Sequence, residues 1–142
     1  MKYTSILVMV FLAMVPAAWS QSLSFGFGDV ELEATLNELD VSAKVDIKGF
    51  TIEASAQWGL STVQVTAALS QGLAPAEVYV AAFLANASGK SLDTVVTLYK
   101  KDKKAGWGAL AKSLGIKPGS EAFKAFKTKT KASATKVKGK KK

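Results

Sequence analysis

The chain offers few residue types for catalysis. It contains no His and no Cys, and Arg is also absent, so nucleophile systems built on His or Cys, histidine metal sites and arginine clamps are excluded. Paired carboxylates act on glycosidic bonds in other proteins, but the densest acidic cluster is more simply a solvated face: Glu31, Glu33, Glu38 and Asp40. No calcium loop or phosphate loop is present. We therefore expect no enzymatic activity, no metal and no cofactor.

Lysine is abundant, and its distribution along the chain is uneven. Residues 21–99 carry a net charge of −6, whereas residues 100–142 carry fifteen lysines against two carboxylates, a net charge of +13. Clustered lysines neutralise phosphates or acidic glycans by counterion release, without sequence choice. We predict contact with anionic lipid, lipopolysaccharide or nucleic acid through the last eight lysines: Lys127, Lys129, Lys131, Lys136, Lys138, Lys140, Lys141 and Lys142.

The same charge segregation permits a second interpretation. An acidic body and a basic tail attract each other between molecules, so the chain is alternatively a structural or assembly protein that self-associates. A separate protein partner also stays open. Residues 110–125 have the spacing of a helix-turn-helix, but the second helix offers little besides lysine to contact base edges. We expect no sequence-specific binding of nucleic acid.

Trp107 lies between two glycines and has two interpretations. Gly106 and Gly108 let the backbone turn closely on either side, and the indole ring is large enough to anchor a core. This architectural role is the favoured one. The functional alternative is a groove for a peptide or glycan, bordered by Tyr99, Trp107 and Lys117.

The N-terminal residues predict export. Lys2 provides a charged start, residues 6–15 form an uninterrupted apolar run, and residues 16–20 end in small side chains, as in a secretory signal peptide. The run is too short for a membrane span, which needs about 20 residues. We predict a signal peptide over residues 1–20, no transmembrane segment after its cleavage, and a periplasmic or extracellular location.

The remaining pattern predicts short helices around an apolar core. Helix caps are expected at Ser61 or Thr62, Ser91 and Ser120, Pro75 suits a first helical turn, and glycines follow several apolar stretches. Residues 30–58 fit both strand and helix periods. Asp40 as an N-cap and Gly59 as a stop favour helix, and no Asn-Gly or Asp-Gly hairpin turn appears.

We therefore predict an all-α fold of about five or six short, orthogonally packed helices. The alternative is an α+β fold with an N-terminal β-hairpin in residues 30–58. In domain terms, residues 21–28 are a flexible leader and residues 29–126 the helical domain. Residues 127–142, called the tail below, contain lysine, small residues and Val137 as the one large apolar side chain. Such a composition predicts disorder.

The segment 106–123, GWGALAKSLGIKPGSEAF, resembles the C-terminal part of a family of small uncharacterised exported bacterial helical proteins. The shared pattern is GWG-x-[IL]A-x-x-LGIKPGS-x-x-F, and the similarity extends over residues 75–123. Family members often continue with Phe-His after the Ser, whereas Lys124 follows Phe123 in this chain. The resemblance implies an exported helical domain and no particular activity.

Overall fold

The structure is a computed structural model that describes residues 23–139. The predicted all-α fold is confirmed, and the described range contains no strand. It has seven helices rather than five or six: α2 (Val30–Val45), α3 (Ile47–Trp58), α4 (Thr62–Leu69), α5 (Pro75–Ser88), α6 (Leu92–Lys101), α7 (Gly106–Ser113) and α8 (Glu121–Gly139). None of the helices in this range is long and apolar enough to cross a membrane. The predicted signal peptide lies outside the described residues.

Local signals set most helix boundaries between residues 59 and 101. The Ser61 side chain accepts a hydrogen bond from the Gln64 backbone N–H, and the Gln64 side chain accepts one from the Ser61 N–H. Pro75 is the first residue of α5, and Ser91 caps α6 through the Thr94 N–H. These boundaries confirm the predictions: Ser61 and Ser91 accept from backbone donors that a helix start leaves free, and Pro75 has no such donor to satisfy.

Residues 30–58 form α2 and α3 rather than a β-hairpin, and the predicted cap at Asp40 was wrong. The helices are capped by Asp29, which accepts from the Leu32 N–H, and by Asp46, which accepts from the Gly49 N–H. Asp40 lies within α2, 4 % exposed, and accepts a 3.0 Å hydrogen bond from the Ala76 N–H of α5. It therefore caps a helix distant in the sequence.

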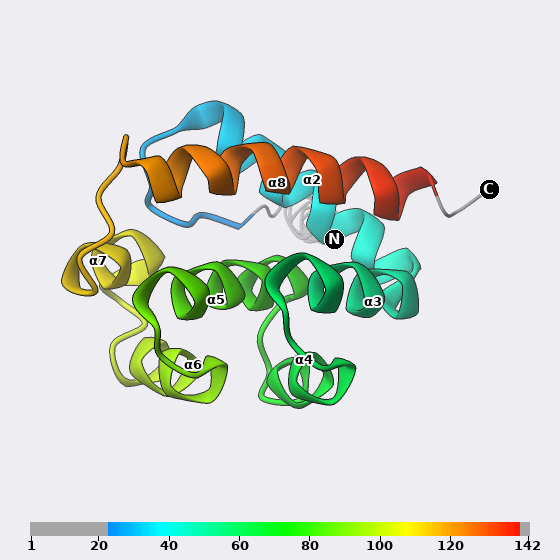
Figure 1. The fold of residues 1–142 in the computed structure, drawn as a ribbon, viewed down its shortest axis with the longest axis horizontal. Helices are drawn as coiled ribbons and strands as arrows, with labels where there is room; N and C mark the ends of the chain where they lie inside the picture. The colour runs from blue at the N-terminus through cyan, green and yellow to red at the C-terminus, as the bar shows by residue number, and fades with distance from the viewer. Residues whose placement is uncertain (1–22, 140–142) are drawn as a thin grey trace, which may run out of the picture.

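The helices pack in three tiers around α5 (Figure 1). Helices α8 and α2 form the upper tier, and α5 and α3 form the middle tier. Helices α4 and α6 form the lower tier, and α7 lies at one end. Residues 78–85 of α5 are all buried, as expected for a helix that is apolar on every side. Rings from several helices surround it, and the Phe83 and Phe126 rings stack with centroids 4.0 Å apart.

The predicted flexible leader is packed over its described part, residues 23–28. Phe25 and Phe27 are 1 % and 6 % exposed, respectively. The Glu33 carboxylate accepts hydrogen bonds from both of their backbone N–H groups, at 2.9 and 3.1 Å. Gly108 donates to the Phe25 carbonyl at 2.8 Å, and a methyl group at Gly108 would collide with the Gly26 carbonyl. Residues 23–28 of the leader are therefore ordered and pack over α7.

The prediction of a disordered tail was wrong for residues 127–139. They continue α8 as far as Gly139, and one face of the helix is buried at Thr130, Ser133, Ala134 and Val137. The side chains on this face are mostly small or polar rather than large and apolar, so the composition of the segment does not indicate that the face is buried. Its positions nevertheless recur at three and four residues, the spacing of one helix face.

Candidate functional site

The tail lysines pair with carboxylates of the acidic body. Lys127 Nζ lies 2.9 Å from Asp29 and 3.5 Å from Glu31, and Lys131 Nζ lies 2.6 Å from Glu31. The remaining pairs are Lys138 with Glu38 at 3.1 Å and Lys136 with Glu53 at 4.0 Å. Residue numbers rise together along the two partners on α2 and α8, so these helices run side by side in the same direction and are not orthogonal.

These ion pairs shift the pKa values of the groups at the start of α2. A hydrogen bond from Lys127 lowers the pKa of Asp29, and one from Lys131 lowers the pKa of Glu31. The hydrogen bond with Asp29 raises the pKa of Lys127. The pairs lie at the surface, with the side chains of Lys131 and Lys138 54 % and 61 % exposed. Surface pairs of this kind contribute little stability and stay open to exchange.

A buried polar cluster joins α8 to α5 and α3. The Tyr79 hydroxyl lies 2.7 Å from Ser133 Oγ, and Ser133 donates a 2.8 Å hydrogen bond to the Glu53 carboxylate. Tyr79 also donates to the Lys129 carbonyl. Burial is the main cause that raises the pKa of Tyr79 to about 12. The cluster explains how a polar face of α8 can be buried, because its hydroxyl groups find partners.

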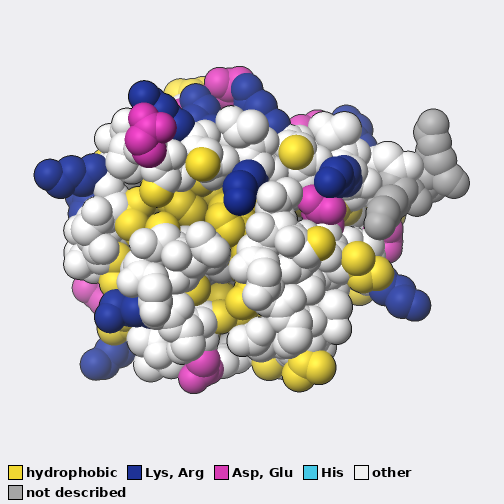
Figure 2. Space-filling model, in the orientation of Figure 1, with side chains coloured by type: hydrophobic (Ala, Val, Ile, Leu, Met, Phe, Trp, Pro, Cys, Tyr) yellow, Lys and Arg dark blue, Asp and Glu magenta, His cyan; other side chains and the backbone are white. Residues whose placement is uncertain are grey.

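Lys129 contacts an aromatic ring instead of a carboxylate. Its Nζ lies 4.9 Å from the centre of the Trp58 ring, a distance at which an ammonium group is attracted by the face of the ring. Lys129 is half-buried and has no ion pair with a carboxylate of residues 23–139. Figure 2 shows lysine side chains standing along α8, with hydrophobic side chains in the hollow below it. The last three predicted contact residues, Lys140, Lys141 and Lys142, lie outside the described range.

The rings of Tyr99 and Trp107 stack on each other, and one carboxylate binds both side chains. Their rings are 3.8 Å apart with an angle of 8° between the planes, and Trp107 is 1 % exposed. Glu77 accepts hydrogen bonds from the Tyr99 hydroxyl at 3.0 Å and from Trp107 Nε1 at 3.2 Å, and its other oxygen accepts from the Ala74 N–H. Burial, together with the charge of Glu77, raises the pKa of Tyr99 to about 12.

Tyr99 and Trp107 are in contact, but the three residues suggested for a groove do not form one. Trp107 is too deeply buried to line an open groove, and Lys117 is exposed and does not line the groove that contains Tyr99. Tyr99 instead lines a different groove, of about 420 Å³, between α6 and α7. The lysines at and beside this groove are recognisable in the sequence as the run Lys100-Lys101-Asp102-Lys103-Lys104.

No protein family, curated protein or solved structure matches this chain. The resemblance of residues 75–123 to a family of exported helical proteins therefore stays a prediction. Within residues 23–139, no group of three or more Asp or Glu side chains is placed to hold a metal ion. Two basic surfaces are the candidate sites: the outer face of α8 and the link between α6 and α7.

Proposed function

We propose that this chain is an exported, non-enzymatic binding protein whose tail lysines contact polyanions. The observation that carries the proposal is the charge excess of residues 100–142, a net +13. Ion pairs within the chain neutralise only part of this positive charge, because Lys127, Lys131, Lys136 and Lys138 pair with only four carboxylates. Phosphate and carboxylate groups spaced along a polymer or a membrane surface suit a row of lysines on one helix.

The geometry of α8 supports this proposal. Its inner face is held by the apolar and hydroxyl groups already described, so its lysines project from a fixed scaffold. The side chain of Lys136 is 61 % exposed, with its carboxylate partner at the limit of ion-pair distance. A polyanion can compete with Glu53 for this ammonium group, because the 4.0 Å separation leaves the pair weak and the lysine side chain itself is open to solvent.

A matched pair of double variants tests the proposal. Binding of the full-length exported chain to double-stranded DNA, used as a soluble polyanion, is measured across a salt series. We expect the change Lys129→Gln with Lys136→Gln to weaken binding and to reduce the slope of log affinity against log salt by about 2, since each phosphate contact contributes about 0.9.

The control is Lys48→Gln with Lys90→Gln, which removes two exposed lysines from the acidic body. It should leave the salt slope nearly unchanged. Equal losses in the two double variants would mean that only net charge matters. A wild-type chain that binds neither DNA nor anionic vesicles at low salt would refute the proposal.

Assembly between molecules through the acidic body and basic tail remains the alternative proposal. It is weakened by the ion pairs within one chain, which occupy Asp29, Glu31 and Glu38. Light scattering of the pure protein at low salt tests it. Association that disappears on deletion of residues 127–142 would favour assembly over polyanion binding.

A further inference from the structure

A second basic surface lies at the α6–α7 corner, defined here as residues 98–113. Its groove has a volume of about 420 Å³, within the range of roughly 300–1,000 Å³ that is typical of ligand sites. Its floor is apolar or small, and it is formed by Leu98, Tyr99, Ala105, Gly106, Ala109 and Leu110. The polar side chains at its edge are Lys101, Asp102 and Ser113.

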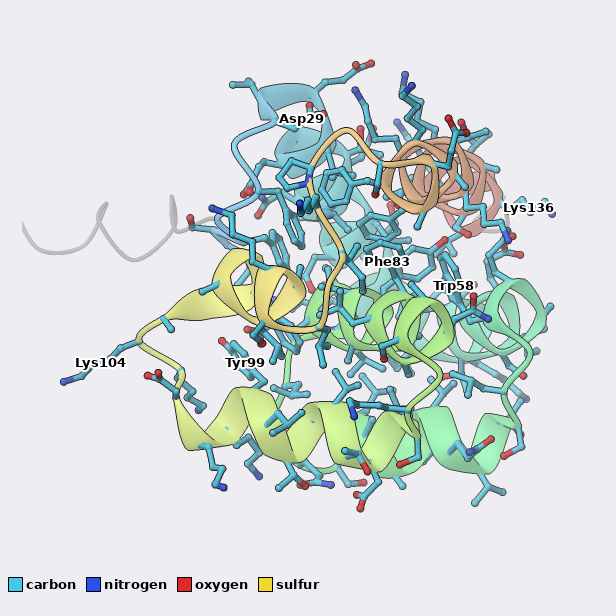
Figure 3. All side chains as sticks on the ribbon, turned by 60° about the vertical axis from the view of Figure 1, so that its left-hand side comes forward. Asp29, Trp58, Phe83, Tyr99, Lys104 and Lys136 are labelled. Carbon is cyan, nitrogen blue, oxygen red and sulfur yellow. The ribbon has the colours of Figure 1, made fainter. Side chains whose placement is uncertain are left out.

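Lysines lie at and beside this groove: Lys101 lines it, and Lys103 and Lys104 follow in the link between α6 and α7. Lys101, Lys103 and Lys104 are exposed, and none of them forms an ion pair with a carboxylate of residues 23–139. Asp102 is the one acidic residue in the link between α6 and α7. In Figure 3, Tyr99 extends from α6 toward α7, whereas Lys104 projects outward from the link. The corner therefore combines an apolar hollow with an outward-facing positive charge.

We propose that the α6–α7 corner docks on an anionic lipid bilayer, with Lys103 and Lys104 at the headgroups and part of an acyl chain in the groove. This inference rests on the proposed binding of polyanions and names a lipid surface as the target. Charge complementarity selects anionic over zwitterionic lipid. The apolar floor selects a lipid over a nucleic acid, whose phosphates would meet the lysines but leave Leu98 and Leu110 facing water.

The form of the groove favours a bilayer over a single soluble lipid molecule. Leu98, Tyr99 and Leu110 are only half-buried, and Ala105 and Ala109 are exposed. A carrier of free lipid must enclose most of the ligand surface, as binding pockets usually do. This groove can cover only part of one chain, which suits a lipid whose remaining surface stays in the membrane.

The corner is tested by sedimentation of the full-length exported chain with phosphatidylglycerol vesicles. Lys103→Gln with Lys104→Gln should weaken vesicle binding about 25-fold, since a lysine near an anionic surface contributes a factor of about five. Ala109→Glu adds a negative charge to the groove and should weaken vesicle binding at least about fivefold. Both changes affect exposed positions, so wild-type thermal unfolding is expected and is checked for each variant.

Control and competing outcomes separate this inference from the proposed function. Lys112→Gln with Lys117→Gln removes two exposed lysines that do not line the groove and should weaken vesicle binding far less. Ala109→Glu should leave DNA binding unchanged.

If Ala109→Glu binds vesicles like the wild type, or loses DNA binding equally, the lipid groove is wrong. If the α8 variants alone lose vesicle binding, the proposed function stands and the corner is wrong. If the corner variants alone lose vesicle binding, and the α8 variant also binds DNA like the wild type, the tail proposal fails.

Discussion

Glu77 holds together residues that are far apart in the sequence. Its carboxylate accepts hydrogen bonds from Ala74, Tyr99 and Trp107, so α5, α6 and α7 are joined at one point. The stacked rings of Tyr99 and Trp107 lie against it. Hydrogen bonds to a charged acceptor are stronger than those between neutral groups, which makes this position more sensitive to substitution than its half-buried state suggests.

Trp107→Ala tests the architectural role of the indole ring. We expect it to lower the free energy of unfolding by about 3–5 kcal/mol, as large-to-small changes at buried aromatic positions do, measured by urea denaturation. Tyr99→Phe is the milder companion, because it keeps the stacked ring and removes one hydrogen bond to Glu77. Wild-type stability in Trp107→Ala, combined with altered binding to vesicles or DNA, would show instead that the ring belongs to a ligand site.

Tyr79 and Tyr99 predict a loss of stability in alkali. Each has a folded-state pKa of about 12, above the value of about 10 for an exposed tyrosine. A raised folded-state pKa contributes stability that is fully present below pH 10 and is lost as the pH rises toward 12. Urea midpoints at pH 7 and pH 11 should differ less in Tyr79→Phe than in the wild type. An unchanged difference would contradict this assignment.

At the scale of the element, α8 is part of the domain and not an appendage. Phe123 and Phe126 pack against Phe27 and Phe83. Farther along the helix, Thr130, Ser133, Ala134 and Val137 are buried against the body. Helix α2 therefore acquires its covering surface only when the last part of the chain has folded onto it.

Deletion of residues 127–142 distinguishes this arrangement from a solvated tail. We expect the free energy of unfolding to fall by about 3 kcal/mol or more, because the deletion uncovers the apolar surface beneath α8. Urea denaturation followed by circular dichroism measures the loss. Deletion of residues 140–142 is the control, since it removes three lysines and none of the packed face. Equal stability of the two truncated proteins would mean that the second half of α8 contributes nothing.

At the scale of the whole molecule, the two oppositely charged halves are folded onto each other. The basic half places lysines against Asp29, Glu31, Glu38 and Glu53 of the acidic half. Exposed pairs add little stability, so the buried face of α8 determines where the helix lies. A ligand must compete with a carboxylate for the lysines that form these ion pairs. The lysines of the α6–α7 corner form no ion pair with a carboxylate of residues 23–139, so a ligand meets no such competition there.

The sequence by itself determined the class of the fold and many of the positions at which its helices begin. Capping residues such as Ser61 and Ser91, and Pro75 in a first turn, act on neighbouring backbone groups, so their effect can be predicted from local order. The charge segregation also follows from composition alone. The role of Trp107 as a core residue agrees with the favoured interpretation of its glycine neighbours.

Only the tertiary structure decided the place of α8, the burial of the leader and the role of Asp40. Asp40 caps α5, which begins 35 residues later in the chain, so no local pattern could reveal its partner. Ser133 and Thr130 can be buried because their hydroxyl groups have hydrogen-bond partners. Ser133 bonds to Tyr79 and Glu53, and Thr130 donates to the Phe126 carbonyl. Hydropathy counts such residues as solvated. The cost of burying a polar group depends on partners that composition does not specify.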